Sequence, residues 1–480
     1  MNGTIVSVSP ADQGDRLGEF SWSLDAARQA VAAARAAQPA WAALPLADRI
    51  AALERLRARF TANQEALATA IAREVGKPLW EARSEAALLA AKVTSTLGEG
   101  LRLVATRRPE GVDGEWRFRP HGVLAVLGPF NFPAHLANGH VVPALLLGNA
   151  VVLKPSEKAP AVGALYAKVV AEAELPPGVF QLAQGERRVG EYLSSEAEVD
   201  GVLFTGSVSV GTAIARANAG NPGKILALEL GGKNAAVVCA DADLDLAAYA
   251  VAYGAFATAG QRCSSTSRCV VRRELLDAFA AKLSALAARA GVGHWQRPDV
   301  FMGPLVSEPA RQAFLAALRE GEAEGAEVVQ AGGAFDDGGS GKRGFYVRPS
   351  VHLVRRRLPA SRYQREELFG PDVALYPVES DEEAVVVAND SRFGLCASVF
   401  TADRARFEWF AGKLEAGVIN WNSPTVGASG KLPFGGVKDS GNHRPAGIFS
   451  SLYCAWPAAL SFTPAKLDEK TAPPGLPVRL

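Results

Sequence analysis

Residues 122–157 read GVLAVLGPFNFPAHLANGHVVPALLLGNAVVLKPSE, and this stretch decides the fold. It begins with a short apolar run, Gly122–Leu127, which breaks at a Gly-Pro pair. The stretch 138–150 then has the composition of a helix, and VVLK at 151–154 reads as a short buried strand that ends in a polar loop. Strand, turn, helix and strand in this order predict a unit of a parallel α/β sheet.

The same alternation continues in both directions along the chain. Before it, Ala-, Leu- and Arg-rich segments at 23–59 and 63–97 have the spacing of amphipathic helices. After it, DGVLFTGS at 200–207 reads as strand and turn, and a long apolar helix is expected at 244–260. Short strands continue beyond it. The fold class is therefore α/β, with a parallel, doubly wound sheet in the first half and a second α/β domain after it. Ligands bind beyond the carboxyl ends of such strands, where the sequence places Asn131, Lys154, Glu157 and Ser207.

Composition limits the class of protein. A chain of 480 residues predicts two or three domains of about 100–200 residues each. Its 51 basic and 50 acidic residues give a net charge of +1, so we expect no nucleic-acid partner. No stretch has the length or apolar composition of a membrane span or a secretory leader. Five cysteines without CxxC or zinc-finger spacing indicate no metal site and a reducing, cytoplasmic location.

Three residues stand out as candidates for chemistry. Cys263, in AGQRCSS, is either a reactive thiol or the small buried hydrophobe that a free cysteine usually becomes. Glu229 ends an apolar strand before two glycines, where burial would raise its pKa and suit a general base; a salt-bridged surface Glu is the other interpretation. Asn131, in GPFNFP, either donates its amide to an oxyanion or forms a turn.

A further set of residues indicates a nucleotide site. The stretch GSVSVG, which includes Gly206, Ser207 and Gly211, follows a strand and opens a helix, although it is not a full GxGxxG fingerprint. In KPSE, Lys154 and Glu157 follow a buried strand. An acidic residue at such a point can bind ribose hydroxyls, which favours NAD over NADP.

Seven ordered blocks decide between these interpretations: GPFNFP, GNAVVLKPSE, FTGS, LELGGKN, GQRC, EELFGP and LPFGG. Over nearly its whole length the chain resembles the aldehyde dehydrogenase superfamily. The resemblance implies that Cys263 attacks an aldehyde to form a thiohemiacetal, whose oxyanion is held by the Asn131 side chain and the Cys263 backbone N–H. Hydride transfer to NAD leaves a thioester, and Glu229 activates the water that hydrolyses it. A thiolate suits both steps, because it is a strong nucleophile and a good leaving group.

The resemblance also implies the cofactor contacts. Lys154 and Glu157 would bind the adenosine ribose, Ser207 the pyrophosphate and Glu367 the nicotinamide ribose, with Phe369 packed near the nicotinamide. Their neighbours complete the predicted NAD site, which comprises Lys154, Ser156, Glu157, Gly206, Ser207, Gly211, Glu367 and Phe369.

One branch of the family gives a closer resemblance, the enzymes that oxidise succinylglutamate semialdehyde in arginine catabolism. The stretches that carry it are RPHGVLAVLGPFNFPAHLANGHVVPALLLGN and SGNHRPAG followed by YCAWP. The chain departs from that branch in reading ELGGKN for EMGGNN and SSTSR after Cys263. A substrate with two carboxylates calls for cationic or amide donors, and the candidates are Arg262, Asn422, His443 and Arg444. For Arg444, a surface ion pair is an equal alternative.

Other functions remain in competition. Another acidic or aliphatic aldehyde is the first alternative. A CoA-acylating relative would not need Glu229, and a non-catalytic protein would not need the set of Cys263, Glu229 and Asn131.

The resemblance implies three parts: a Rossmann-like NAD-binding domain (1–101, 121–230 and 439–456), an α/β catalytic domain (231–438) and a small strand extension for oligomerisation (102–120 and 457–480). It implies a homodimer or homotetramer. The Pro-rich tail after Trp456 is expected to be irregular or used in assembly.

Overall fold

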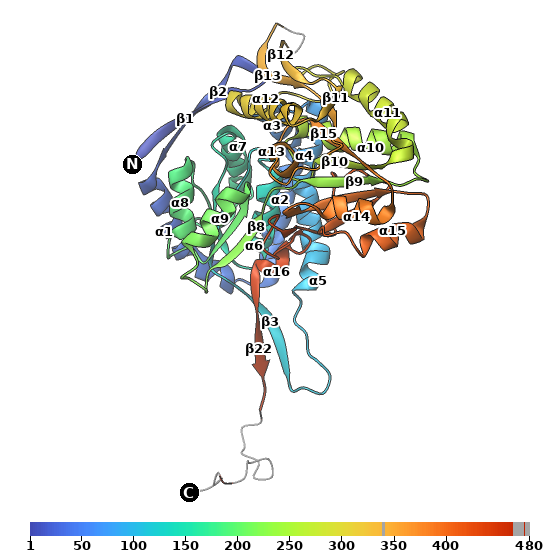
Figure 1. The fold of residues 1–480 in the computed structure, drawn as a ribbon. Helices are drawn as coiled ribbons and strands as arrows, with labels where there is room; N and C mark the ends of the chain where they lie inside the picture. The colour runs from blue at the N-terminus through green and yellow to red at the C-terminus, as the bar shows by residue number, and fades with distance from the viewer. Residues whose placement is uncertain (338–340, 464–474, 476–480) are drawn as a thin grey trace.

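The computed structural model describes residues 1–337, 341–463 and 475. Two parallel sheets lie one after the other along the chain, each covered by helices (Figure 1). The first sheet has five strands in the order β6-β5-β4-β7-β8, all parallel. Its strands are β4 (Val123–Leu127), β5 (Ala150–Lys154), β6 (Phe180–Leu182), β7 (Gly201–Thr205) and β8 (Ile225–Glu229).

Helices cover both faces of this first sheet, which explains why its central strands are continuous apolar runs. Alternate residues of each strand face opposite sides: Val123 and Ala125 pack with α1, α8 and α9, whereas Leu124 and Val126 pack with the other group. The first group is α1 (Leu24–Ala43), α8 (Arg187–Ser195) and α9 (Val208–Ala217); the second is α2 (Leu46–Ala62), α3 (Gln64–Val75), α4 (Leu79–Ser95), α6 (His135–Leu146) and α7 (Pro160–Ala171).

The second sheet has seven strands in the order β11-β14-β15-β10-β9-β17-β18. All neighbours are parallel except the edge strand β11, which is antiparallel to β14. Helices α10 and α11 lie above β9 and β10 in Figure 1, and α14 and α15 lie below them. The bounds are β9 (Asn234–Val238), β10 (Thr266–Arg272), β11 (Glu327–Gln330), β14 (Ser350–Leu353), β15 (Asp372–Val378), β17 (Cys396–Phe400), β18 (Val418–Trp421), α10 (Leu244–Phe256), α11 (Leu276–Arg289), α12 (Glu308–Ala323), α13 (Arg362–Arg365), α14 (Asp381–Asn389) and α15 (Arg404–Ala411).

Three predicted helical stretches are divided or shorter in the structure. The stretch 23–59 contains two helices, α1 and the start of α2, which are separated by Leu44 and Pro45. The helix expected at 63–97 is wrong as one element, because α3 ends at Gly76, whose φ of 82° is left-handed, and Pro78 precedes α4. The helix expected at 244–260 ends at Phe256 and gives way to a tight turn. The sequence also did not predict the N-terminal hairpin, β1 (Asn2–Ser9) and β2 (Asp12–Ser23).

A two-stranded ribbon projects from the body at the bottom of Figure 1. It pairs β3 (Gly114–Pro120) with β22 (Ala455–Ser461), so the tail after Trp456 is not irregular as far as Ser461. The predicted extension at 102–120 and 457–480 corresponds to this ribbon, apart from 464–474 and 476–480, which lie outside the described residues. Its proposed role in oligomerisation remains a prediction.

The chain between the second sheet and the ribbon returns to the first sheet. Gly441 forms an antiparallel bridge with Glu229, and the Asn442 side chain bonds the backbone of Leu226 and Leu228. The short elements of this region are β19 (Pro433–Phe434), β20 (Val437–Lys438), β21 (Ala446–Gly447) and α16 (Ser450–Tyr453). Other short elements are β16 (Phe393–Gly394), which pairs with β20, a π-helical turn (Thr96–Gly100), two 3-10 turns (Ala257–Gly260 and Arg273–Leu275), α5 (Leu101–Leu103), β12 (Gly333–Asp337) and β13 (Arg343–Arg348).

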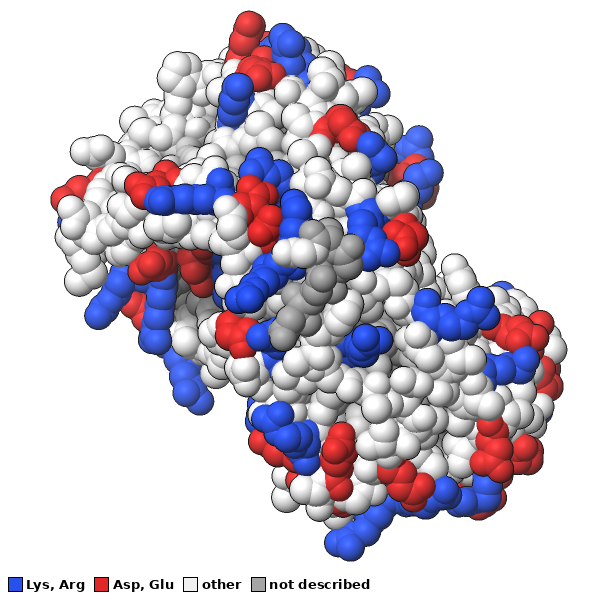
Figure 2. Space-filling view, turned by 90° about the horizontal axis from the view of Figure 1, so that it is seen from above, with Lys and Arg blue, Asp and Glu red and all other residues white. Residues whose placement is uncertain are grey.

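Surface charge is mixed. Basic and acidic side chains are interspersed on the face seen in Figure 2. Within the described ranges, no helix has both the length and the apolar composition needed to cross a membrane. In the same ranges, no group of three or more His, Cys, Asp and Glu side chains could hold a metal ion.

Candidate active site

The candidate site lies where opposite ends of the two sheets meet. Glu229 is the last residue of β8, and Asn131 follows the carboxyl end of β4. The second sheet faces them with its amino ends, because Asn234, the first residue of β9, bonds the Cys263 carbonyl at 2.7 Å. The topology therefore gathers Asn131, Glu229 and Cys263, which are far apart in the chain.

The backbone before Cys263 is held in an unusual conformation. Thr258, Ala259 and Gly260 have successive φ values of 57°, 52° and 69°. A left-handed conformation is a genuine outlier for a β-branched residue such as Thr258. Outliers of this kind cluster at functional sites, where the surrounding structure over-determines them. The turn places Cys263 at the surface of the second domain, partly exposed, while the four other cysteines are buried.

The Cys263 thiol lies among acidic groups. Burial, followed by the charges of Glu367 and Glu229, raises the pKa of Cys263 to about 12. The nearby backbone N–H groups of Ser264 and Cys263 act in the opposite direction. The resting side chain is thus a thiol at neutral pH, and forming the nucleophilic thiolate requires a base nearby.

Glu229 has the environment that the sequence predicted for it. Its side chain is 6% exposed, and its Oε2 has no hydrogen-bond partner in the described residues. Burial raises the pKa of Glu229 well above its usual range, although the Ala446 N–H donates to the carboxylate and offsets part of the rise. No cation forms an ion pair with it there. A carboxylate of this kind can take a proton near neutral pH.

Each of the two glycines after Glu229 is required because a side chain at that position would collide with a different neighbour. A Cβ on Gly231 would lie 2.4 Å from Glu367 Oε2, and a Cβ on Gly232 would lie 2.2 Å from the Cys263 carbonyl oxygen. Both distances are far below van der Waals contact. Gly231 therefore admits the Glu367 carboxylate and Gly232 admits the Cys263 turn, which explains the Gly-Gly pair of LELGGKN.

Asn131 is buried beside the Cys263 turn. Its side-chain Nδ2 donates to the Gln261 carbonyl at 2.9 Å, two residues before Cys263. An amide nitrogen has two N–H groups, so the second remains for an oxygen bound at Cys263. The Phe132 ring next to it is in contact with two cations, with Lys77 Nζ 3.4 Å and the Arg262 guanidinium carbon 5.0 Å from its centre.

The predicted nucleotide residues lie along the carboxyl edge of the first sheet. Lys154 ends β5, and its buried Nζ lies 3.6 Å from Glu157 and donates to the Pro155 carbonyl. Ser156 Oγ accepts the Lys158 N–H. Lys154 and the exposed Glu157 therefore place a cationic and an anionic group side by side at this edge of the sheet.

The turn after β7 forms the next part of that edge. Ser207 caps α9 by accepting the Val210 N–H, so its hydroxyl and the helix N-terminus share one place. Gly211 lies in α9 against Leu230, where a Cβ would meet the Leu230 side chain at 2.5 Å. A Cβ on Gly206 would likewise be too close to the Phe204 ring. Small residues thus bring the start of α9 close to the sheet, which suits a pyrophosphate.

Glu367 and Phe369 face the Cys263 turn from the second domain. Glu367 Oε1 accepts the Gly232 N–H at 3.0 Å, and burial raises the pKa of Glu367 to about 7. Phe369, at a φ of 54°, meets the Phe130 ring edge-on at 5.9 Å. These residues border a hollow of about 300 Å³ that is lined by Gly232, Gly260, Arg262, Ser265, Ser267, Glu367, Leu368, Phe369, Gly370 and Asp372.

Two of the four predicted substrate contacts, Arg262 and Asn422, are bonded to other groups in the structure. Arg262 is engaged with Glu81 at 2.8 Å and with the Thr258 hydroxyl at 2.7 Å. The Asn422 amide both donates to and accepts from the Thr401 backbone, at the carboxyl end of β17. The Cys263 turn lies at the amino end of that sheet, so the position of Asn422 argues against substrate contact.

His443 and Arg444 are exposed, and they directly precede Pro445 and Ala446, which lie beside the Glu229 side chain. The chain runs antiparallel to β8 from Gly441, toward the amino edge of the first sheet. The charge of Arg444 lowers the pKa of His121, which precedes β4, whereas Asn131 follows the other end of that strand. That these two residues bind substrate remains a prediction.

Two residues that the sequence did not single out lie on the Asn131 side. Lys92, 7% exposed, donates to the Gly447 carbonyl and the Ser450 hydroxyl, and no ion pair joins it to a described carboxylate. Burial lowers the pKa of Lys92 to about 8. His135 is the first residue of α6, four residues after Asn131 in the chain, and its Nδ1 has no partner in the described chain. Only the position of His135 four residues after Asn131 could have signalled it.

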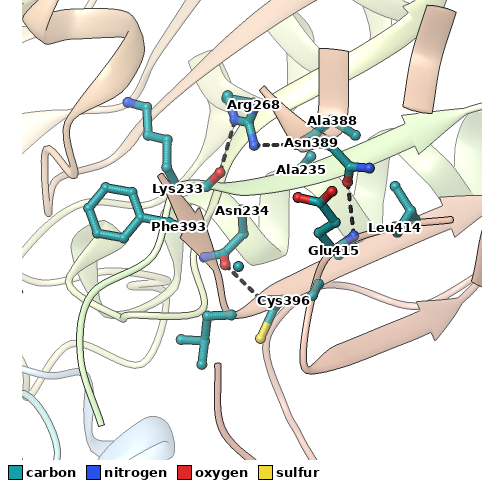
Figure 3. A pocket seen from close by; sticks show the side chains of 14 residues that line it. Lys233, Asn234, Ala235, Arg268, Ala388, Asn389, Phe393, Cys396, Leu414 and Glu415 are labelled. Carbon is teal, nitrogen blue, oxygen red and sulfur yellow. Dashed lines mark hydrogen bonds between the residues drawn. The ribbon is translucent and has the colours of Figure 1, made fainter. Parts of the chain in front are cut away.

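A second hollow of about 270 Å³ lies behind the Cys263 turn, at the start of β9. Figure 3 shows Asn234 pointing from β9 toward Cys396, and Arg268 reaching the Lys233 carbonyl. Arg268 also donates to carbonyls at the end of α14, where a cation is favourable. This packing anchors the segment that carries LELGGKN.

Comparison with known proteins agrees with this geometry. The aldehyde dehydrogenase family model matches residues 2–454. The chain is 40% identical to the N-succinylglutamate 5-semialdehyde dehydrogenase of Escherichia coli K12 over 96% of its own length and 94% of that protein.

Solved structures give the same result. An NAD-dependent aldehyde dehydrogenase from Sinorhizobium meliloti superposes with a TM-score of 0.91 at 32% identity, covering 98% of this chain and 93% of that one. An aldehyde dehydrogenase C variant from Pseudomonas syringae, solved with NAD⁺ and octanal, gives 0.90 at 32% identity, over 97% and 95% of the two chains. The chain belongs to the aldehyde dehydrogenase family.

Proposed function

We propose that this protein oxidises an aldehyde to a carboxylate with NAD, using Cys263 as the nucleophile, Asn131 as an oxyanion donor and Glu229 as the general base. The observation that carries the proposal is the meeting of these three side chains where the two sheets face each other, with Glu229 buried and without an ion-pair partner.

The first step is the attack of the Cys263 sulfur on the aldehyde carbon. A C–S bond forms, the carbonyl π electrons move to oxygen, and the thiol proton passes to a base. The oxyanion of the thiohemiacetal is stabilised by the free Asn131 N–H and the Cys263 backbone N–H. Collapse of the alkoxide expels a hydride and leaves a thioester on Cys263.

Glu229 acts in the second half of the reaction. Its carboxylate takes a proton from a water molecule, the water oxygen attacks the thioester carbon, and the C–S bond breaks to release the carboxylic acid. Unpartnered Oε2 is the atom available to that water. Since burial holds the pKa of Glu229 well above its usual range, the group is a stronger base than an exposed Glu.

The proposed cofactor is NAD, which accepts the hydride when bound. The chain's residues fit it. Lys154 and Glu157 would bind the adenosine ribose, the α9 N-terminus at Ser207 the pyrophosphate, and Glu367 the nicotinamide ribose. The same carboxylate at Glu157 disfavours a 2′-phosphate, so we propose NAD rather than NADP.

The proposed substrate is N-succinylglutamate 5-semialdehyde. The E. coli relative at 40% identity carries that name, and the chain matches nearly all of it. The structure adds Lys92, a buried cation bonded only to neutral groups, and His135 with its free Nδ1. A buried cation without a counter-charge is costly. A substrate carboxylate at this end of the site would supply that counter-charge.

Replacing the nucleophile tests the reaction. Cys263→Ala should abolish NADH formation and leave NAD binding, measured by calorimetry, within about twofold of the parent. Cys239→Ala, a buried cysteine at the end of β9, is the matched control and should retain turnover. Turnover by Cys263→Ala would refute the assignment. CoA-dependent product release in the parent protein would favour the acylating alternative.

A further inference from the structure

Strand β8 carries Glu229 at its end and forms one edge of the first sheet. Its inner side bonds the chain of β7, through groups such as the Ile225 N–H and the Glu229 carbonyl. The alternate residues Leu226 and Leu228 turn their backbone groups to the outer side, where the sheet has no further strand. Another part of the chain must therefore satisfy those groups.

The outer side of β8 is covered by a linking segment, residues 435–445, that is anchored on the second domain. Ser440 is fully buried, and its hydroxyl accepts the Gly394 N–H of β16 at 3.0 Å. Its carbonyl accepts the Leu230 N–H, also at 3.0 Å, and the next residue, Gly441, forms an antiparallel bridge with Glu229. The linking segment therefore ties the Glu229 strand to the domain that carries the proposed nucleophile.

Asn442 continues this contact with its side chain instead of its backbone. Its Oδ1 accepts the Leu228 N–H at 2.9 Å, and its Nδ2 donates to the Leu226 carbonyl at 2.8 Å. A side-chain amide has a donor end and an acceptor end, which are the two groups that an adjoining strand would offer. Asn442 thus holds two of the three backbone positions that directly precede Glu229, on the outer edge of β8.

The Glu229 carboxylate depends on the backbone of β8 for its place. Its Oε2 has no hydrogen-bond partner among the described residues, so no side-chain contact there fixes that oxygen. The linking segment borders the other oxygen, since a Cβ on Gly435 would lie 2.9 Å from Glu229 Oε1 and 2.7 Å from the Cα of Pro445. A shift of β8 against the linking segment would therefore move the proposed base relative to the reacting atoms.

We infer that Asn442 is a positioning residue that holds β8 against the linking segment and so keeps Glu229 in place to activate water. This inference rests on the proposed role of Glu229 as general base. Asn442 acts through the backbone of β8 and not on the reacting atoms. Because the proposed base acts after hydride transfer, loss of Asn442 should slow thioester hydrolysis and leave thioester formation unchanged.

The test separates the two halves of the reaction in the full-length protein. Single turnovers use NAD with limiting N-succinylglutamate 5-semialdehyde or propanal, whichever the parent oxidises faster. Stopped-flow NADH absorbance follows thioester formation, and rapid-quench mass spectrometry of the intact protein follows decay of the acyl-enzyme. Asn442→Ala should slow the decay by about tenfold or more, because a catalytic group misplaced by about 1 Å can lose about a hundredfold in rate. NADH formation should stay within about twofold of the parent.

The matched control is Asn389→Ala. Asn389 is also half-buried, and its side chain also bonds two backbone groups of a neighbouring segment. Its Nδ2 donates to the Lys413 carbonyl at 2.8 Å, and its Oδ1 accepts the Glu415 N–H at 2.9 Å, the contact drawn in Figure 3. Since this pair of bonds does not hold β8, both rates should stay within about twofold of the parent.

A Glu229→Gln background shows whether Asn442 acts through the proposed base. There Asn442→Ala should give no further decrease in acyl-enzyme decay, because the group that it positions is already absent. The same additional decrease in that background would overturn the inference. So would an unchanged decay in the single variant, or equal losses in both halves of the reaction.

A second variant covers a failure to fold. If Asn442→Ala does not fold, Asn442→Asp decides by the same comparison of the two halves, since it keeps an acceptor for the Leu228 N–H but cannot donate to the Leu226 carbonyl. A parent protein that forms no NADH from either aldehyde would overturn the proposed function, and the inference with it.

Discussion

Replacing Glu229 by Gln removes the proposed base with little change of shape. The carboxylate is buried, and burial raises its pKa well above the usual range, so it takes a proton more readily than an exposed Glu. A Gln side chain has nearly the same size and shape but no carboxylate to act as a base. What it removes is the ability to take a proton from water.

The expected loss follows from that function. A positioned general base contributes about a hundredfold to ten-thousandfold in rate, and we expect kcat of Glu229→Gln to fall by that factor. Attack by Cys263 and hydride transfer precede the water step, so the first turnover should remain visible. Stopped-flow NADH absorbance should show a burst close to one equivalent per site, followed by a slow steady rate. A burst that is lost together with turnover would refute the assignment of Glu229 to thioester hydrolysis.

Three further predictions follow from the same structure. Thermal melts should show Glu229→Gln gaining stability over the parent as pH rises, because a raised native pKa costs about 1.4 kcal/mol for each pH unit above the ordinary value of 4.5 until the native pKa is reached; a difference independent of pH would contradict the burial argument. Gly231→Ala should raise KM for NAD with less effect on the aldehyde, since its Cβ would displace Glu367; equal effects on both would contradict it. Lys92→Met should raise KM about tenfold or more for dicarboxylic aldehydes and leave propanal unaffected, as expected for a lost charge-assisted contact; equal losses for both aldehydes would show a structural role only.

The sequence predicted much of the fold because local patterns decide it. Buried parallel strands such as β4 and β5 are continuous apolar runs, and they were recognisable for that reason. The breaks in helices were less visible. Gly76 ends α3 through a left-handed φ, and the turn at Thr258 and Ala259 is imposed by tertiary contacts on residues that favour helix.

The candidate site could also be predicted only in part from the sequence. Cys263, Glu229 and Asn131 stand in distinctive blocks, and the fold brings their segments together. The substrate contacts were harder, because pairing depends on the whole fold: Arg262 is bonded to Glu81, 181 residues earlier in the chain. Lys92 becomes notable only when burial and the lack of an acidic partner are both known.

The most direct test of the central claim is the initial rate of NADH formation with N-succinylglutamate 5-semialdehyde, beside simple aldehydes and other acidic ones. We predict a kcat/KM at least about a hundredfold higher for this substrate, roughly 2.7 kcal/mol of transition-state discrimination. A flat profile would contradict the proposed substrate and leave the aldehyde dehydrogenase chemistry, and no NADH from any aldehyde would contradict the proposed reaction itself.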